Sequence, residues 1–506
     1  MTPAPLRSIS APRGLAAASA LLLALLAPHA AAGNLAPPRA AATSQSTLAA
    51  RIDSILARPA LRQAHWGVLV RDAGTGRVLY ARNAERHFIP ASSLKLVVSA
   101  TAAHHLPADF RFRTTVHGTG AVSGGVLQGD LVLYGRGDPM ISDRYFPTRT
   151  SVWEALADSL KARGIRRVAG AVVADESFFD ADRVRGDWEA YDTRWWYGAP
   201  VSALGFNDNS IDFRIAPGVT TGARPVITWE PQSSFVSLEN TASTGAAGGT
   251  NTLDFERTRG NGVRAYGVFP AGAAPRTEHF AVADPAEYAG TTFREVLERR
   301  GIEVANDEVR VVSDPARSPA RGAAVLAEHQ SPPLDKAIGP ILLNSQNWFA
   351  EQLLKATARQ VAGEGSWDAG LRVEREFLTG VVGIDSADVV LRDASGLSAG
   401  NLVTPRAFVQ LLDYVRRTPR QAVVRDALPV SGGKGSLQAR FTELPGRVRA
   451  KTGYIGNVDS LTGYLTRADG SEVIFTIIAN ASGQPSSRMK AGIDDVVRAV
   501  AADRGR

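Results

Sequence analysis

The stretch FIPASSLKLVVSATAAHHL, residues 88–106, places two serines and a lysine at the head of an apolar run. A segment that is apolar on nearly all sides is typical of a helix buried in a core. Residues i and i+3 of a helix share a face, so Ser92 and Lys95 would point into one pocket. Ser93 lacks such a partner, because Leu96 stands three places after it.

Lysine is rare in this chain: of the 57 lysine and arginine residues only seven are lysines, at positions 95, 161, 336, 355, 434, 451 and 490. Lysine differs from arginine because burial can lower its pKa until the proton is lost. A neutral Lys95 would accept the proton of Ser92 as that oxygen attacks a carbonyl. The alternative is that Ser92 caps the helix and Lys95 extends to the surface.

Ser-x-x-Lys occurs twice more, and both other matches indicate different structures. Two glycines separate Ser431 from Lys434, which predicts a turn. Ser487 and Lys490 begin an amphipathic terminal helix, with Lys490 expected in solvent.

Two further motifs each occur once. Ser345-Gln346-Asn347 stands where an amphipathic helix begins, so a helix cap is the alternative interpretation. Lys451-Thr452-Gly453 follows the strand-like RVRA and precedes VDSLTGYLT and SEVIFTIIAN, a pattern that predicts an antiparallel meander closed by the terminal helix. For Lys451 alone, the alternative is a charge at the end of a strand. The order of the three motifs is specific, although each one is weak.

With these motifs in this order, the chain resembles the serine penicillin-binding proteins, and among them the D-alanyl-D-alanine carboxypeptidase/endopeptidase family, peptidase family S13 of the penicillin-binding protein 4 type. YGRGDPMIS, YGAPVSALGFNDNSI, DASGLSAGNLVTP and LPVSGGKGSL also match that family, from about Leu48 to near the C-terminus. Two positions depart from it. The family often has Asp at Gln346 and Thr at Tyr454, and the second departure puts in question a hydroxyl that helps to hold the substrate carboxylate.

The resemblance implies an α+β fold of the penicillin-binding protein/β-lactamase-like transpeptidase type, an antiparallel sheet flanked by helices, with inserted β-rich accessory domains. It also implies a penicillin-sensitive D-Ala-D-Ala carboxypeptidase and/or endopeptidase that acts on peptidoglycan stem peptides, with β-lactams as covalent inhibitors and no cofactor or metal.

The same resemblance implies a role for each motif residue. Ser92 is the acylated nucleophile and Lys95 its proton acceptor; Ser345 relays a proton to the leaving D-alanine, and Asn347 binds the substrate amide. Lys451 supplies positive charge for the terminal carboxylate, and Thr452, Gly453 and Tyr454 complete the substrate-binding strand. The oxyanion hole is expected from the backbone N–H groups of Ser92 and Tyr454.

Two rival functions remain open at this level. A β-lactamase of the same fold would need a base for fast deacylation, which the sequence does not reveal. A catalytically inactive cell-wall binding protein would keep the fold alone. The long insertion favours the peptidase, and the presence of every motif side chain favours an active site.

Motif spacing predicts the domain organisation. Ser92 and Ser345 are 253 positions apart, but Ser345 and Lys451 only 106, which indicates an insertion between the first two motifs. The expected segments are a signal peptide (1–32), a flexible linker (33–46), a first catalytic part (47–111), an inserted β-rich region of two modules (112–328) and a second catalytic part (329–506).

The N-terminus and the composition bear on location and partners. LAAASALLLALLA follows Arg7 and Arg13 and precedes an Ala-x-Ala pattern ending at Ala32, which predicts a cleaved signal peptide and export to the periplasm or cell-wall space; an uncleaved anchor is the alternative. The absence of cysteine excludes disulfides and thiolate chemistry. The net charge of +7 is mild and no basic run interleaved with aromatic residues was identified, so nucleic acid is not an expected partner. The oligomeric state is not indicated.

Overall fold

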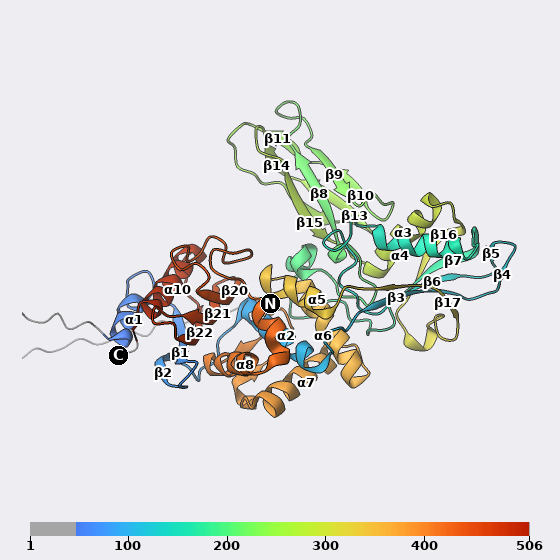
Figure 1. Ribbon diagram of the computed structural model, residues 1–506. Helices are drawn as coiled ribbons and strands as arrows, with labels where there is room; N and C mark the ends of the chain where they lie inside the picture. Colours follow the sequence, from blue (N-terminus) through green and yellow to red (C-terminus); the bar gives the residue numbers. More distant parts are fainter. Residues whose placement is uncertain (1–46, 505–506) are drawn as a thin grey trace, which may run out of the picture. The chain divides into compact units, whose positions relative to one another are not determined.

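The computed structural model describes residues 47–504, so the expected signal peptide and linker lie outside the described residues. A five-stranded sheet with the order β2-β1-β22-β21-β20 joins the two ends of the described chain, blue and red in Figure 1. All its pairings are antiparallel, which confirms the predicted meander of the last three strands. The strands are β1 (His65–Asp72), β2 (Val78–Arg82), β20 (Val448–Ile455), β21 (Val458–Thr466) and β22 (Glu472–Asn480).

Alternating side chains of this sheet build two separate cores. Val68 and Val70 of β1 pack on one face, whereas Leu69 between them lies in the core of the other face, because successive strand residues point to opposite sides. The first core is completed by the apolar sides of the terminal helices. These are α1 (Leu48–Leu56) and α10 (Ser486–Ala501).

The other face is covered by helices that surround α2 (Lys95–His105). Every residue of α2 from Lys95 to Ala103 is buried, as its uniformly apolar sequence predicted. α2 contacts four other helices of this layer: α5, α6, α7 and α9. The remaining elements of the layer are α5 (Leu334–Leu343), α6 (Asn347–Ala362), α7 (Trp367–Glu376), α8 (Pro405–Arg417), α9 (Ala422–Asp426) and a short ribbon of β18 (Val389–Val390) and β19 (Leu402–Val403).

A second, mixed sheet lies between α2 and α5 in the sequence, with the order β17-β3-β6-β7-β5-β4 and β16 paired parallel to β7 (Figure 1). The chain enters through β3 and leaves through its antiparallel neighbour β17, where Arg113 pairs with Gln330; the expected border at residue 328 falls inside β17. The elements are β3 (Arg113–Gly118), β4 (Val122–Ser123), β5 (Val126–Leu127), β6 (Leu131–Gly135), α3 (Ser151–Ala162), β7 (Arg167–Asp175), α4 (Pro285–Arg299), β16 (Glu303–Val312) and β17 (Ala324–Gln330).

A further set of small sheets is nested inside this segment. It begins with β8 next to Asn209 and ends with β15, and the Val282 N–H donates to the Asn209 carbonyl at 2.9 Å, so the chain enters and leaves at one place. The strands are β8 (Ser210–Ala216), β9 (Val226–Glu230), β10 (Ser237–Asn240), β11 (Ser243–Gly245), β12 (Asp254–Arg257), β13 (Gly262–Tyr266), β14 (Val268–Pro270) and β15 (Arg276–Ala281).

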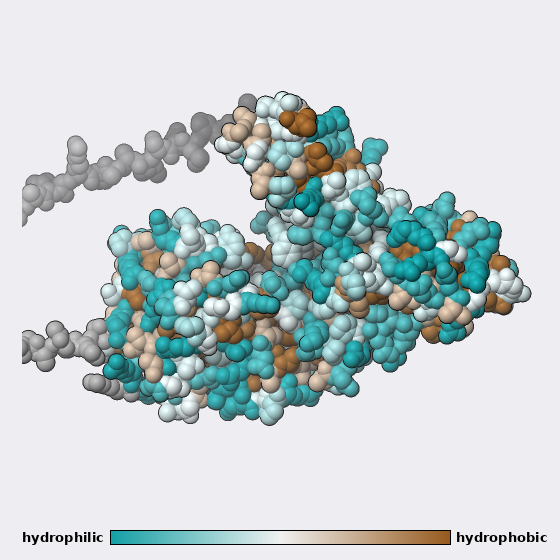
Figure 2. All heavy atoms as spheres, turned by 45° about the horizontal axis from the view of Figure 1, so that its top comes forward, coloured by the Kyte–Doolittle hydropathy of each residue, from teal (hydrophilic) through white to brown (hydrophobic). Residues whose placement is uncertain are grey.

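The face of the molecule drawn in Figure 2 is mainly hydrophilic, with small and separate hydrophobic areas. Within residues 47–504, no helix combines the length and the apolar character that crossing a bilayer requires.

Candidate active site

Ser92 lies in a short 3₁₀ turn, Ala91–Leu94, that leads directly into α2. The turn starts at Ala91, whose φ of +47° belongs to the left-handed region, and neither the turn nor α2 has a side-chain cap. Lys95 is fully buried, and its Nζ lies 2.8 Å from Ser92 Oγ. Neither the helix-cap interpretation of Ser92 nor the surface interpretation of Lys95 fits this geometry.

Lys95 Nζ has two further partners besides Ser92. It donates to Asn347 Oδ1 at 2.6 Å and to the Ser395 carbonyl at 2.7 Å. Burial lowers the pKa of Lys95 to about 7, although the negative charges of Asp393 and Glu351 act in the opposite direction. A large share of this amine is therefore neutral at neutral pH.

The Ser345-Gln346-Asn347 segment is the entry to α6. Ser345 has a left-handed φ of +63°, and its Oγ accepts a hydrogen bond from Lys451 Nζ at 2.8 Å. Asn347 is the first residue of α6, and its Nδ2 donates to the Tyr197 carbonyl at 2.8 Å. Its amide therefore connects Lys95 to a segment of the insertion.

Lys451 lies within β20, the edge strand next to the Ser92 turn, and not at a strand end. It is fully buried and also donates to the Thr452 carbonyl at 2.6 Å. Burial, and secondarily the positive charge of Lys95, lower the pKa of Lys451 well below the ordinary lysine value. Two hydrogen-bonded chains therefore meet at the site, Ser92–Lys95–Asn347 and Ser345–Lys451, with the amines of Lys95 and Lys451 close enough to repel each other.

The next residues of β20 face the Ser92 turn or solvent. At Gly453 an added Cβ would lie 2.8 Å from the Pro90 carbonyl oxygen and 3.1 Å from the Ser92 nitrogen, so glycine is required for this close approach. Thr452 Oγ1 donates to Ser436 Oγ at 2.9 Å. The Tyr454 side chain is 56% exposed and its ring lies 5.1 Å from Lys490 Nζ, so it points away from Lys451.

A buried carboxylate that sequence reasoning missed supports the Lys95 pocket. Glu351 accepts hydrogen bonds from the Ser395 N–H at 2.8 Å, the Ala394 N–H at 3.1 Å and the Trp367 indole at 2.8 Å. Burial and the neighbouring Asp393 raise the pKa of Glu351 to about 7. The DASGLSAG stretch was the available sequence signal, but its contact with Glu351 depends on tertiary folding.

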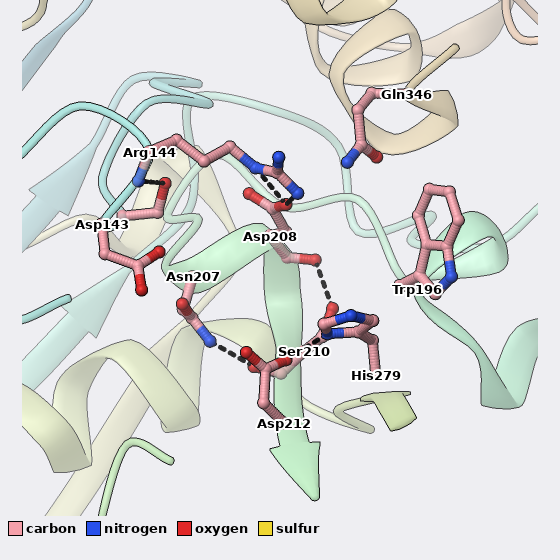
Figure 3. Close-up of a pocket in the computed structure, with 10 residues that line it drawn as sticks. Asp143, Arg144, Trp196, Asn207, Asp208, Ser210, Asp212, His279 and Gln346 are labelled. Atoms are coloured by element: carbon pink, nitrogen blue, oxygen red, sulfur yellow. Dashed lines mark hydrogen bonds and ion pairs between the residues drawn. The ribbon is translucent and has the colours of Figure 1, made fainter. Parts of the chain in front are cut away.

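Gln346 lines a separate hollow of about 300 Å³, which it shares with Trp196, Asp208 and His279 (Figure 3). Its Oε1 is buried and has no hydrogen-bond partner among residues 47–504. On the opposite wall, Arg144 donates to Asp208 through Nε at 2.9 Å and Nη2 at 2.7 Å. Gln346, where the family often has Asp, therefore changes the wall of the hollow and makes no contact with Lys95.

Comparison with known proteins gives a consistent result along the chain. A sequence model of the D-Ala-D-Ala carboxypeptidase 3 (S13) family matches residues 48–500. A D-alanyl-D-alanine carboxypeptidase of Actinomadura sp. (strain R39) is 38% identical over 451 residues, which cover 86% of this chain and 81% of that relative. The D-alanyl-D-alanine carboxypeptidase DacB of Haemophilus influenzae is 26% identical over 439 residues, covering 84% and 87% of the two chains.

A solved structure has the same fold. The crystal structure of penicillin binding protein 4 (dacB) from Haemophilus influenzae superposes with a TM-score of 0.79 at 23% identity, covering 89% of this chain and 98% of that one. The predicted fold class is thereby confirmed, including the extra sheets outside the five-stranded one.

Proposed function

The chain belongs to the D-Ala-D-Ala carboxypeptidase 3 (S13) family, and from this premise we propose that Ser92 is the nucleophile with which it cleaves peptidoglycan stem peptides. As a member it is a penicillin-sensitive serine peptidase. The observation that carries the assignment of Ser92 is the 2.8 Å contact between its Oγ and the buried Nζ of Lys95.

Acylation follows from the hydrogen bonds of Lys95. A neutral amine has two N–H bonds and one lone pair, and its two N–H bonds are directed to Asn347 Oδ1 and the Ser395 carbonyl. The lone pair is then left for the Ser92 hydroxyl. As Ser92 Oγ attacks the carbonyl carbon of the penultimate D-alanine, its proton passes to Lys95.

The remaining roles are assigned to the groups around this pair. The backbone N–H groups of Ser92 and Tyr454 stabilise the oxyanion, donors that typically contribute about 3 kcal/mol each. Ser345 relays a proton to the departing D-alanine amine. Lys451 and Thr452 attract the terminal carboxylate of the substrate, and Asn347 binds its amide. Water then hydrolyses the acyl-enzyme.

The rival functions have less support. An inactive wall-binding protein has no need of a neutral buried lysine beside a partly exposed serine, a combination that disfavours folding. The β-lactamase interpretation has no specific observation in its favour, and the whole-length family match supports the peptidase. We further propose that the enzyme acts outside the cytoplasm after removal of residues 1–32, where its substrate is found.

Incubation with labelled penicillin, followed by peptide mapping, tests the assignment. One adduct is expected, on the peptide that contains Ser92. Ser92→Ala removes it, whereas Ser431→Ala and Ser487→Ala keep it. Two further assays distinguish carboxypeptidase from endopeptidase action. Release of D-alanine from a D-Ala-D-Ala peptide reports the first activity, and cleavage of the cross-link between stem peptides reports the second. Labelling that persisted in the Ser92→Ala protein would refute the mechanism.

A further inference from the structure

A groove of about 870 Å³ lies at the ends of α2 and α6 that are remote from Ser92. Pro107, just after α2, and Gln360, in the last turn of α6, both line it. With a helical rise of about 1.5 Å per residue, these positions are roughly 18–20 Å from Lys95 and Asn347, where the two helices begin. The groove is therefore separate from the active site.

The lining carries an excess of positive charge. Arg111, Arg113 and Arg136 face a single lining carboxylate, Asp109. The nearest carboxylate oxygen to Arg113 is that of Glu328, at 3.9 Å. Within residues 47–504, neither Arg111 nor Arg136 has a carboxylate oxygen within 4.0 Å, although most buried or half-buried arginines of this chain have one.

Two of these arginines lie at the same end of a strand pair. The β3–β6 ladder ends at the pair Thr114–Gly135, and Arg113 precedes Thr114 whereas Arg136 follows Gly135. Two like charges at the same end of a strand pair repel each other. An anion bound between the two guanidinium groups would remove this repulsion.

Aromatic rings lie among the arginines. The Arg136 guanidinium is 5.2 Å from the ring centre of Tyr134, and that of Arg359 is 5.0 Å from the ring centre of Phe178. Stacking on a ring positions a guanidinium while its N–H edge stays available for a planar acid group. Burial and Asp175 raise the pKa of Tyr134, and the positive charges of Arg136, Arg359 and Arg321 act in the opposite direction.

One short sequence pattern contributes to this groove. Phe110-Arg111-Phe112-Arg113 alternates aromatic and basic residues over only four positions. Phe112 is buried and both arginines are exposed, as alternation along extended backbone requires. Arg136 and Phe178 come from distant parts of the chain, so the sequence alone did not indicate a groove.

We propose that this groove binds a carboxylate-bearing segment of polymeric peptidoglycan, remote from the bond that Ser92 attacks. Guanidinium groups bind carboxylates in a bidentate manner, and every uncleaved stem peptide ends in a carboxylate. The half-buried rings provide apolar faces for sugars and stems. The proposal rests on the proposed function, but it concerns affinity for the polymer and not the chemical step.

Co-sedimentation with purified, insoluble peptidoglycan tests it, with the Arg113→Gln/Arg136→Gln double variant against the parent. The bound fraction of the variant is expected to correspond to an affinity about three- to tenfold weaker, the effect of losing two exposed charge contacts. Added salt should weaken binding of the parent more than that of the variant. The matched control is Arg214→Gln/Arg224→Gln, which removes two exposed arginines, one in β8 and one just before β9.

Hydrolysis of a soluble D-Ala-D-Ala peptide separates this proposal from the proposed function. Both double variants should hydrolyse the peptide at the parental rate; a parent that fails to do so refutes the function and not the groove. Equal sedimentation of parent and variant, or equal loss in the control, overturns the groove. The proposal is also overturned if the parent no longer binds peptidoglycan from which phosphate polymers have been stripped, because the ligand would then be a phosphate and not a carboxylate.

Discussion

Lys95 is the residue at which lysine and arginine are least interchangeable in this chain. Lys95→Arg keeps a positive charge and much of the stem, but a guanidinium stays protonated at any working pH. We expect acylation by labelled penicillin to fall about 10²- to 10⁴-fold in a folded protein. Lys434→Arg, at an exposed position, is the control and should acylate normally. A folded Lys95→Arg protein with the parental rate would return Ser92 and Lys95 to structural roles.

The same burial sets the pH dependence of acylation. Because the pKa of Lys95 is lowered to about 7, the amine is protonated and inactive as a base below this pH and neutral above it. The acylation rate should therefore fall about tenfold per pH unit below the midpoint and level off above it. Stopped-flow measurement from about pH 5 to about pH 9 checks this. A midpoint near the ordinary lysine pKa of about 10.4 would contradict a buried general base.

At the scale of elements, α6 carries two groups that hold Lys95 from one helical face. Asn347 and Glu351 are four residues apart and so lie on the same side of α6. Asn347 contacts Lys95 directly, whereas Glu351 acts through the Ser395 backbone: it accepts the Ser395 N–H, and the Ser395 carbonyl accepts from Lys95. Glu351 is therefore a positioning residue, and its substitution tests the arrangement.

In Glu351→Gln, one oxygen replaces two, and the new NH₂ group faces N–H donors. The lost hydrogen bonds would weaken the hold on the Ser395 backbone by about 1–3 kcal/mol. Because the Ser395 carbonyl positions Lys95, the acylation rate should fall about tenfold or more. The ionised carboxylate also favours the charged form of Lys95, so the pH midpoint of acylation should shift downward. An unchanged rate and midpoint would exclude the positioning role.

Glu374→Gln is the matched control on α7. Glu374 is equally buried, neither of its carboxyl oxygens has a hydrogen-bond partner among residues 47–504, and burial raises its pKa well above the ordinary value. Because burial disfavours its charged form, a neutral amide of the same shape is the smallest change at this position and should leave acylation and its pH midpoint unchanged.

The site also shows what could be predicted from the sequence. Ser92 and Lys95 are local partners on one turn of chain, so their spacing alone indicated a shared pocket. The support of Ser395 by Glu351, 44 positions away, and the contact of Asn347 with Tyr197, 150 positions away, depend on how distant segments pack, which no local periodicity encodes. The same holds for the burial of Lys451, since its strand pattern fitted an exposed strand end equally well.

At the scale of the whole molecule, we propose that the insertion consists of two nested modules. The outer module spans residues 113–330, and the inner module, residues 210–281, is inserted into it. The inner one enters and leaves at a single hydrogen-bonded point, Asn209 with Val282. It also contacts the segment that leads to the active site. Phe280 of β15 forms an antiparallel bridge with Trp195, and Arg257 of β12 donates to the Thr193 carbonyl at 2.9 Å and to the Ala281 carbonyl at 2.8 Å.

Arg257 should therefore influence catalysis from a strand that holds no catalytic group. Thr193 belongs to the segment that also contains Tyr197, whose carbonyl holds Asn347 beside Lys95. Arg257→Gln would leave buried carbonyls without a donor, so the free energy of unfolding should fall by about 2–4 kcal/mol in denaturant titrations. Loss of the Arg257–Thr193 contact should also loosen the segment that contains Tyr197. D-Ala-D-Ala peptide hydrolysis, measured at temperatures well below the melting transition, should then fall about three- to tenfold. Arg264→Gln removes an exposed arginine whose partner is the half-buried Glu256 on the neighbouring strand, and it should change neither quantity by much. If Arg257→Gln lost stability but hydrolysed peptide at the parental rate, Arg257 would support only the inner module, and Tyr197 would be positioned without it.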